Sequence, residues 1–173
     1  MVTDETGNPA TPFAIDAGHF NPVKAADPGL VYDASYMDYV VYTCSFGVTQ
    51  YFDVAYNCPN SSSLPEPTDL SYPSIQISGL NGTKNIKRTV ANVGKRSSDY
   101  MFSAKSPEEF SITATPNFLE FNHVGQKISF NITVTVKMGQ IPNKYGPDRY
   151  YFGWYAWTNQ NHVVRSQVAV SFT

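Results

Sequence analysis

Hydrophobic residues recur with a period of two over the C-terminal part of the chain. Short alternating or apolar runs such as SYPSIQIS, RTVANVG, FSITATP and RYYFGWYAW are separated there by Gly, Pro, Asn and Ser. In KISFNITVTVKM one side of the predicted strand is hydrophobic, formed by Ile128, Phe130, Ile132, Val134 and Val136. Seven or eight such strands in roughly a hundred residues predict a mainly β fold, a two-sheet antiparallel sandwich.

A helical period occurs in one stretch of the N-terminal part, SYMDYVVYTCSF. Its hydrophobic face would contain Met37, Val40, Val41 and Cys44. Ser35 lies three residues before Asp38, and this spacing is typical of a capping box at a helix start. Around the helix the sequence is rich in loops, so we expect a loop-rich tail with one short helix before the sandwich.

The composition changes at NSSSLPEPTD, residues 60–69, where Ser and Pro are frequent as in a linker. We therefore expect two units, residues 1–65 and residues 66–173. Within the first unit, the dipeptide Pro28-Gly29 predicts a tight turn in which Gly29 adopts a positive φ. One helix and a few turns cannot bury a self-sufficient core, so residues 1–65 should need another body to pack on.

Charge and hydropathy limit the classes of partner. The net charge of −2 gives no electrostatic reason to expect nucleic acid or an anionic membrane. No apolar run is long enough to cross a bilayer, and the amino terminus lacks the basic-then-apolar pattern of a signal peptide. The aromatic fraction of 14% fits strands, in which aromatic residues are enriched.

Three Asn-x-Ser/Thr sequons and two cysteines point to the secretory route. The sequons begin at Asn60, Asn81 and Asn131, and they predict N-glycosylation of an extracellular protein. Cys44 and Cys58 would form a disulfide in an oxidising compartment, worth about 2–4 kcal/mol. The alternative is two buried free thiols. The spacing of the cysteines excludes a CxxC redox pair, and no cluster of His and Cys offers a zinc site.

The chain offers few candidates for catalysis or metal binding. His123 and His162 lie near predicted turns, and no Gly-x-Ser-x-Gly or comparable nucleophile motif accompanies them. A metal site can be imagined from His19, Asp16, Asp27 and Asp33, but prolines and apolar residues separate these carboxylates. No glycine-rich phosphate loop is present. We therefore predict no catalytic residue, no metal and no cofactor.

The aromatic run RYYFGWYAW predicts a strand with two aromatic faces. One face contains Tyr150, Phe152, Trp154 and Ala156, and the other contains Tyr151, Tyr155 and Trp157. The candidate interface aromatics are Tyr151, Tyr155 and Trp157. An exposed face of this kind could bind carbohydrate or protein, whereas the alternative is that the second sheet and a neighbouring domain cover both faces.

Several of these motifs together resemble plant subtilisin-like serine proteases, the subtilases of peptidase family S8. The segment ATPFAIDAGHFNPVKAADPGLVYD is similar to the end of their catalytic domain. DYVVYTCSFG, DLSYPSI, RTVANVG and GWYAWTNQNHVVRSQVAV follow in the family's order and spacing, through a fibronectin type III-like domain. Departures at Asn159 and Gln167, where the family commonly has Asp and Pro, affect a turn and a strand edge.

The resemblance implies a division of the chain and a role for each part. Residues 1–65 would be the C-terminal remnant of the catalytic α/β domain, with Leu30, Val31 and Tyr32 packed against the rest of that domain. Residues 66–173 would be the fibronectin type III-like sandwich. The family's catalytic Asp, His and Ser lie upstream of this region, so this chain should be inactive alone.

The function implied is that of the non-catalytic C-terminal region of a secreted serine endopeptidase. It would stabilise the catalytic domain and shape substrate access in the apoplast or cell wall. Its partners would be the remainder of the protease chain and, for the whole enzyme, a protein or peptide substrate. Three alternatives remain: a stand-alone module that binds extracellular glycans or proteins, an enzyme that uses His19 or His162, and a truncated gene product without an independent role.

Overall fold

The computed structural model describes residues 3, 6–7, 10–15, 20–47, 58–59, 63–137 and 149–173. The helices are α1 (Pro12–Ile15), α2 (Pro22–Ala26), α3 (Tyr36–Ser45) and the 3-10 turn η2 (Pro67–Asp69). The strands are β1 (Leu30–Tyr32), β2 (Ile75–Leu80), β3 (Thr83–Asn92), β4 (Ser98–Lys105), β5 (Phe110–Thr115), β6 (Phe118–Phe121), β7 (Lys127–Val136), β8 (Tyr151–Thr158) and β9 (Val163–Phe172).

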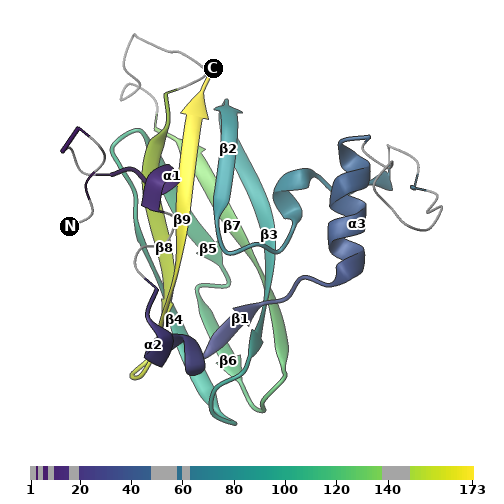
Figure 1. Cartoon of the computed structure of the whole chain (residues 1–173), viewed down its shortest axis with the longest axis vertical. Helices are drawn as coiled ribbons and strands as arrows, with labels where there is room; N and C mark the ends of the chain where they lie inside the picture. Colours follow the sequence, from purple (N-terminus) through teal and green to yellow (C-terminus); the bar gives the residue numbers. More distant parts are fainter. Residues whose placement is uncertain are drawn as a thin grey trace.

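The strands form two layers, which confirms the predicted sandwich (Figure 1). One sheet has the order β1-β3-β7-β5, and the other has the order β2-β9-β8-β4-β6. Three details differ from the expectation. The described part of the tail contains the three helices α1, α2 and α3 rather than one. The described residues form nine strands rather than seven or eight, and β2 pairs with β9 in parallel, whereas all other strand pairs are antiparallel.

The core lies between the sheets and follows the period of two seen in the sequence. Along β7, Phe130, Ile132 and Val134 are buried, while Ser129 and Asn131, which alternate with them, are exposed. The largest fully buried side chains come from both sheets and include Trp157, Tyr100, Tyr155, Phe110, Phe121 and Phe130. Burial of such aromatic side chains is the main source of stability for a sandwich of this size.

Strand β1 corrects one expectation about the N-terminal part. From the sequence, Leu30 is expected to pack against the rest of a catalytic domain. It is instead 2% exposed and belongs to the core of the sandwich itself. β1 pairs antiparallel with β3, with Val31 opposite Ala91. A segment that precedes the Ser/Pro-rich stretch therefore supplies an edge strand to the sheet. The boundary between residues 65 and 66 stays a prediction.

α1 and α2 lie beside the five-stranded sheet, whereas α3 stands at the edge of the sandwich near β2 and β3 (Figure 1). Phe13 of α1 makes edge-to-face contacts with Tyr150 and Phe152, with ring centroids 5.0 and 5.3 Å apart. Asp27, at the end of α2, lies 3.1 Å from Nε2 of His162 in the turn between β8 and β9. These contacts join the N-terminal part to the sandwich at both ends of β8.

Gly29 fixes the turn that leads into β1. Its φ is +75°, as expected for the Pro28-Gly29 turn, and its carbonyl accepts hydrogen bonds from the amides of Val93 and Gly94. A Cβ at this position would lie 2.6 Å from Cγ of His162 and 2.6 Å from the hydroxyl of Tyr100. Both the backbone conformation and the space therefore require glycine.

We expect Gly29→Ala to destabilise the chain more than Gly125→Ala does. Gly125 has a similar φ of +82°, but a Cβ there would meet nothing within 4 Å. Gly125→Ala should cost only the left-handed backbone term, about 1–2 kcal/mol. Gly29→Ala should cost about 1–3 kcal/mol more because of the steric overlap.

Chemical denaturation followed by tryptophan fluorescence measures both variants. Equal losses would show that the contact of Gly29 with Tyr100 and His162 does not constrain the turn.

Candidate functional site

Among the described residues, the histidines and carboxylates considered for catalysis or metal binding do not gather at one site. His162 is 10% exposed at its side chain and pairs with Asp27, whereas Asp33 lies 2.9 Å from Nζ of Lys127. His123 is exposed in the turn before β7. His19 and Asp16 lie outside the described residues. Within the described part of the chain, no group of three metal-binding side chains occurs.

The aromatic face predicted as an interface is instead part of the core. Tyr155 and Trp157 are 0% exposed, and Tyr151 is half-buried with its ring 5.4 Å from that of Phe172. The sequence shows two aromatic faces but not which one meets the second sheet. The opposite face, with Phe152 and Trp154, is the one that points away from the core.

The structure joins Cys44 of α3 to Cys58 by a disulfide, with their Cα atoms 5.7 Å apart. Of the sequon asparagines, Asn81 is exposed in the turn between β2 and β3, and Asn131 is exposed on β7. Asn60 lies outside the described residues. The disulfide ties the C-terminal half of α3 to the chain that leads toward the sandwich.

The candidate site is the junction between α3 and the sandwich, and Arg88 of β3 organises it. Arg88 is 2% exposed, and its guanidinium donates to the carbonyls of Thr68, Lys87, Tyr72 and Ser74 at 2.7–3.4 Å. Burial lowers the pKa of Arg88 from its usual value. The planar guanidinium of Arg88 therefore holds the segment from η2 to β2 in place. The acceptors of these hydrogen bonds are neutral backbone carbonyls.

The partly buried Tyr32 and the fully buried Tyr155 lie close enough to Arg88 to interact with its charge. The hydroxyl of Tyr32, from β1, lies 2.8 Å from that of Tyr155 and 2.5 Å from Oγ of Ser166. Burial raises the pKa of Tyr32 well above its ordinary value, and the proximity of Tyr155 adds to this shift. Burial also raises the pKa of Tyr155. The trio therefore links β1 to β8 and β9 across the sandwich.

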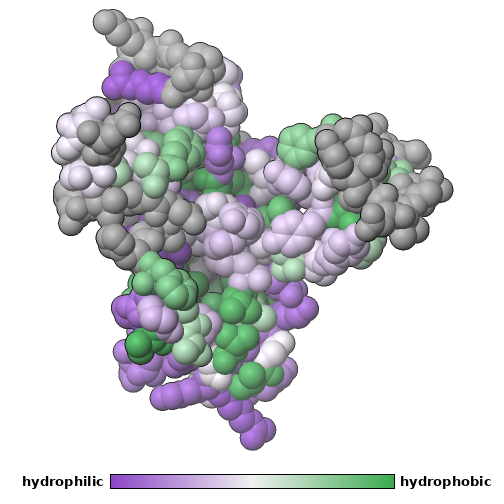
Figure 2. Space-filling view, in the orientation of Figure 1, coloured by the Kyte–Doolittle hydropathy of each residue, from purple (hydrophilic) through white to green (hydrophobic). Residues whose placement is uncertain are grey.

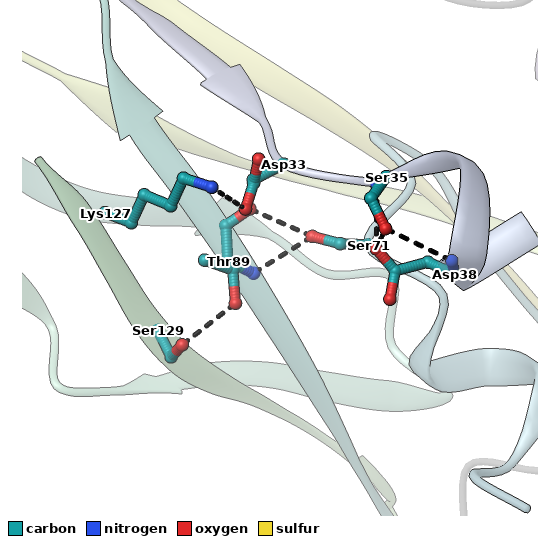
Figure 3. Close-up of polar contacts among 7 residues, drawn as sticks. All are labelled: Asp33, Ser35, Asp38, Ser71, Thr89, Lys127 and Ser129. Atoms are coloured by element: carbon teal, nitrogen blue, oxygen red, sulfur yellow. Dashed lines mark hydrogen bonds and ion pairs between the residues drawn. The ribbon is translucent and has the colours of Figure 1, made fainter. Parts of the chain in front are cut away.

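A polar seam connects the start of the α3 segment to the four-stranded sheet (Figure 3). The hydroxyl of Ser71 donates to the carbonyl of Thr89 and accepts from its amide, and the hydroxyl of Thr89 lies 2.8 Å from that of Ser129. The amide of Asp33 donates to the same Thr89 carbonyl, while its carboxylate pairs with Lys127. This seam fixes where the chain leaves β1.

The predicted capping box then sets the direction of α3 (Figure 3). The carboxylate of Asp38 accepts hydrogen bonds from the amide and hydroxyl of Ser35, and the Ser35 hydroxyl accepts from the amide of Asp38. These bonds lower the pKa of Asp38 from its ordinary value. Two free donors of the first turn are satisfied in this way.

A cleft of about 620 Å³ separates α3 from β2 and η2. Tyr39, Tyr42 and Phe46 line it on the helix side, and Leu70 and Tyr72 line it opposite. On the other side of the junction, a hollow of about 220 Å³ is lined in part by the acidic side chains Asp33, Asp38, Glu66 and Asp69. Among the described residues, this junction offers apolar and hydrogen-bonding surface but no paired nucleophile and base.

Comparisons with known proteins agree with this description. A family model described as a fibronectin type-III domain matches residues 69–170. The subtilisin-like proteases SBT5.6 and SBT5.5 of Arabidopsis thaliana are 48% and 46% identical to the chain, each over 98% of its length. A CO(2)-response secreted protease of the same plant is 32% identical over 99% of the chain. The chain spans about a fifth of the length of these relatives, 21–23%.

We expect Arg88→Met to destabilise the chain strongly. The substitution leaves the carbonyls of Thr68, Tyr72 and Ser74 without their donors, at roughly 1–3 kcal/mol for each that water cannot reach. Lys87→Met, one residue earlier with an exposed side chain, is the matched control and should have little effect. Urea unfolding measures both, and a Met variant as stable as the native chain would show that Arg88 does not hold this segment.

We also expect alkaline pH to destabilise the fold through its buried tyrosines. The folded state favours neutral Tyr32 and Tyr155, so their contribution is complete below about pH 10 and is lost as pH rises above it, where the unfolded chain ionises first. The unfolding free energy should fall by about 1.4 kcal/mol per pH unit for each such group. Tyr32→Phe should reduce this slope, measured by urea unfolding between pH 8 and 11, and an unchanged slope would contradict the assignment.

Proposed function

Because the chain belongs to the fibronectin type-III domain family, in the form that occurs in the C-terminal part of plant subtilisin-like proteases, we propose that it is the non-catalytic C-terminal region of a secreted serine endopeptidase. The observation that carries the proposal is the extent of the match. Relatives at 46–48% identity align with 98% of this chain, and the aligned region is only 21% of their length. Peptide hydrolysis then belongs to the remaining four-fifths or so of such a protein.

The proposed role is to stabilise the catalytic domain and to shape substrate access. Support comes from large hydrophobic side chains that the N-terminal part leaves in solvent. They are Phe13, Phe20, Val23, Tyr36, Met37 and Phe46, with exposed fractions from 46% to 83%. Figure 2 shows hydrophobic surface at the position of α2 and beside α3. Covering one such side chain is worth about 1.5–3 kcal/mol, so the remainder of the protease chain is the occupant that we propose for this surface.

The sandwich would present this surface in a fixed position. β1, Gly29 and the contact between His162 and Asp27 hold α2 against the turn between β8 and β9. The polar seam and the capping box hold α3 beside η2. The catalytic domain would therefore dock on helices whose orientation the sandwich already determines.

The remaining parts of the proposal concern the whole protease. Its substrates would be extracellular proteins or peptides, and its location would be the apoplast or cell wall. The disulfide between Cys44 and Cys58 supports passage through an oxidising compartment. None of the described helices is long and apolar enough to cross a membrane. The alternative of an independent binding module loses its platform, since Tyr155 and Trp157 are buried.

A serine-directed activity probe tests where the activity lies. We expect the probe to label the full-length protease that contains this region and to leave the isolated 173-residue chain unlabelled. Labelling of the isolated chain would overturn the proposal, since it would place a reactive serine within these residues.

The docking surface is tested by Tyr36→Asp in both forms of the protein. Tyr36 is 76% exposed, so the substitution should not change the unfolding midpoint of the isolated chain. In the full-length protease it should reduce the secreted, probe-labelled amount several-fold, since a loss of 1–2 kcal/mol changes abundance by that order. The matched control is Val124→Asp, because Val124 is 55% exposed in the distant turn before β7. Equal behaviour of the two variants in the full-length protein would contradict docking at α3.

A further inference from the structure

We propose that Asn131 carries an N-linked glycan that covers the outer face of the four-stranded sheet. The inference rests on the proposed secretory route and adds to it a modified residue and a surface that stays in solvent. Asn131-Ile132-Thr133 is a sequon in the middle of β7. Ile132 is 0% exposed in the core, so Asn131 and Thr133 both point outward.

The outer face of the four-stranded sheet around Asn131 carries polar side chains, most of them small. The outward positions of the three neighbouring strands are Thr83, Asn85, Lys87 and Thr89 on β3, Ser129, Asn131, Thr133 and Thr135 on β7, and Ser111, Thr113 and Thr115 on β5. Directly opposite Asn131 lie Lys87 on one side and Thr115 on the other, both exposed. A flexible lysine and a threonine leave room for a sugar on the amide nitrogen.

Asn131 also differs from its neighbours in its hydrogen bonds. The hydroxyl of Thr133 donates to Oδ1 of Asn85 at 2.7 Å, and Thr89 lies 2.8 Å from Ser129 in the same way. Within the described residues, the side chain of Asn131 makes no such bond. Asparagine is unfavourable in a strand, and here no contact offsets that cost. Asn131 therefore fits a glycosylation site better than a residue that stabilises the sheet.

The chain would meet the required chemistry in the compartment that forms its disulfide. The co-reactant is an oligosaccharide linked through diphosphate to a lipid. Nδ2 of Asn131 attacks the anomeric carbon, the carbon–oxygen bond to the diphosphate breaks, and the lipid diphosphate leaves. The amide nitrogen loses one proton, so a carbon–nitrogen bond replaces a carbon–oxygen bond without any change of oxidation state.

The folded sheet sets when this transfer can occur. The backbone of Asn131 lies in a ladder between β3 and β5, and the Thr133 hydroxyl of the sequon is already bonded to Asn85. An enzyme that reads the extended sequon could not reach it there. The glycan is therefore added before β7 pairs with its neighbours, and the folded, unmodified chain is a poor acceptor.

A glycan on this face decides which side of the sandwich is free in the whole protease. A bulky, hydrated sugar cannot be buried against a protein body. The outer face of β5 and β7 then stays in solvent. The exposed hydrophobic residues of α2, beside the five-stranded sheet, and of α3, at the edge near β2 and β3, remain for the catalytic domain. The sugar would also lie beside β5, an edge strand whose outer backbone groups could otherwise pair with another chain.

Peptide mapping of the secreted full-length protein tests the proposal directly. Tryptic cleavage after Lys127 and Lys137 yields the peptide Ile128–Lys137, in which Asn131 is the only asparagine. Enzymatic removal of glycans in heavy-oxygen water converts a glycosylated asparagine to labelled aspartate. We expect most of this peptide to carry the label at position 131. A secreted protein in which the peptide is mainly unmodified overturns the proposal, whatever the state of Asn81.

Variants separate the sequon from the hydrogen bond that it contains. Asn131→Gln and Thr133→Ala should each remove one glycan from the protein on a gel, and Thr133→Ser should keep it. Asn85→Ala removes the same hydrogen bond to Thr133 without touching the sequon, so it should keep the glycan. Loss of the glycan in Asn85→Ala but not in Asn131→Gln would place it elsewhere and contradict the proposal.

Failure here and failure of the proposed function have different signatures. A secreted, probe-labelled protease without a glycan at Asn131 would disprove the modification alone. A glycosylated chain whose full-length form is never labelled by a serine-directed probe would disprove the protease role alone.

Discussion

The insertion of β1 into the sandwich is the constraint on which the rest of the structure depends. Leu30 enters the core, the hydroxyl of Tyr32 reaches Tyr155 and Ser166, and Gly29 packs under Tyr100 and His162. Only three residues form the strand, yet they fix α2 on one side and the start of α3 on the other. Without this strand, the polar seam would lose the bonds of Asp33 to Thr89 and Lys127, and α3 would lose its attachment on the N-terminal side.

The sequence predicted those features whose signal is local and repeated. The alternation in β7 and the Ser35–Asp38 capping box were readable because each depends on spacing within one element. β1 was not, because three residues are too few to show a period and its partner β3 lies some sixty residues away. For β8 the two aromatic faces are evident, but which face is buried depends on the second sheet, so the sequence alone does not place Tyr155 and Trp157 in the core. Arg88 gave no signal, since a charged residue in a strand is ordinarily exposed.

The two sides of the sandwich differ in chemistry, and the difference follows from the strands that form them. The outer face of β3, β7 and β5 consists of Thr, Ser, Asn and Lys, which water can solvate without any cover. The five-stranded sheet carries Phe152 and Trp154 outward, and Phe13 of α1 already packs on this face. Hydrophobic side chains of α2 and α3 remain in solvent beside it. A single domain thus has one surface suited to water and one suited to another protein body.

In a larger protease, the sandwich and a protein body bound to α3 would stabilise each other. α3 is connected to the sandwich through the η2–β2 segment that Arg88 holds, and through β1, whose Tyr32 is bonded between the sheets. A body that binds α3 only in its native position stabilises the native sandwich by the free energy of that contact, since it does not bind the unfolded chain. By the same linkage, the sandwich stabilises the bound form of the body. Because Arg88 donates to neutral carbonyls and Tyr32 bonds to uncharged hydroxyls, this mutual support depends on burial and hydrogen bonds, and screening by salt should weaken it little.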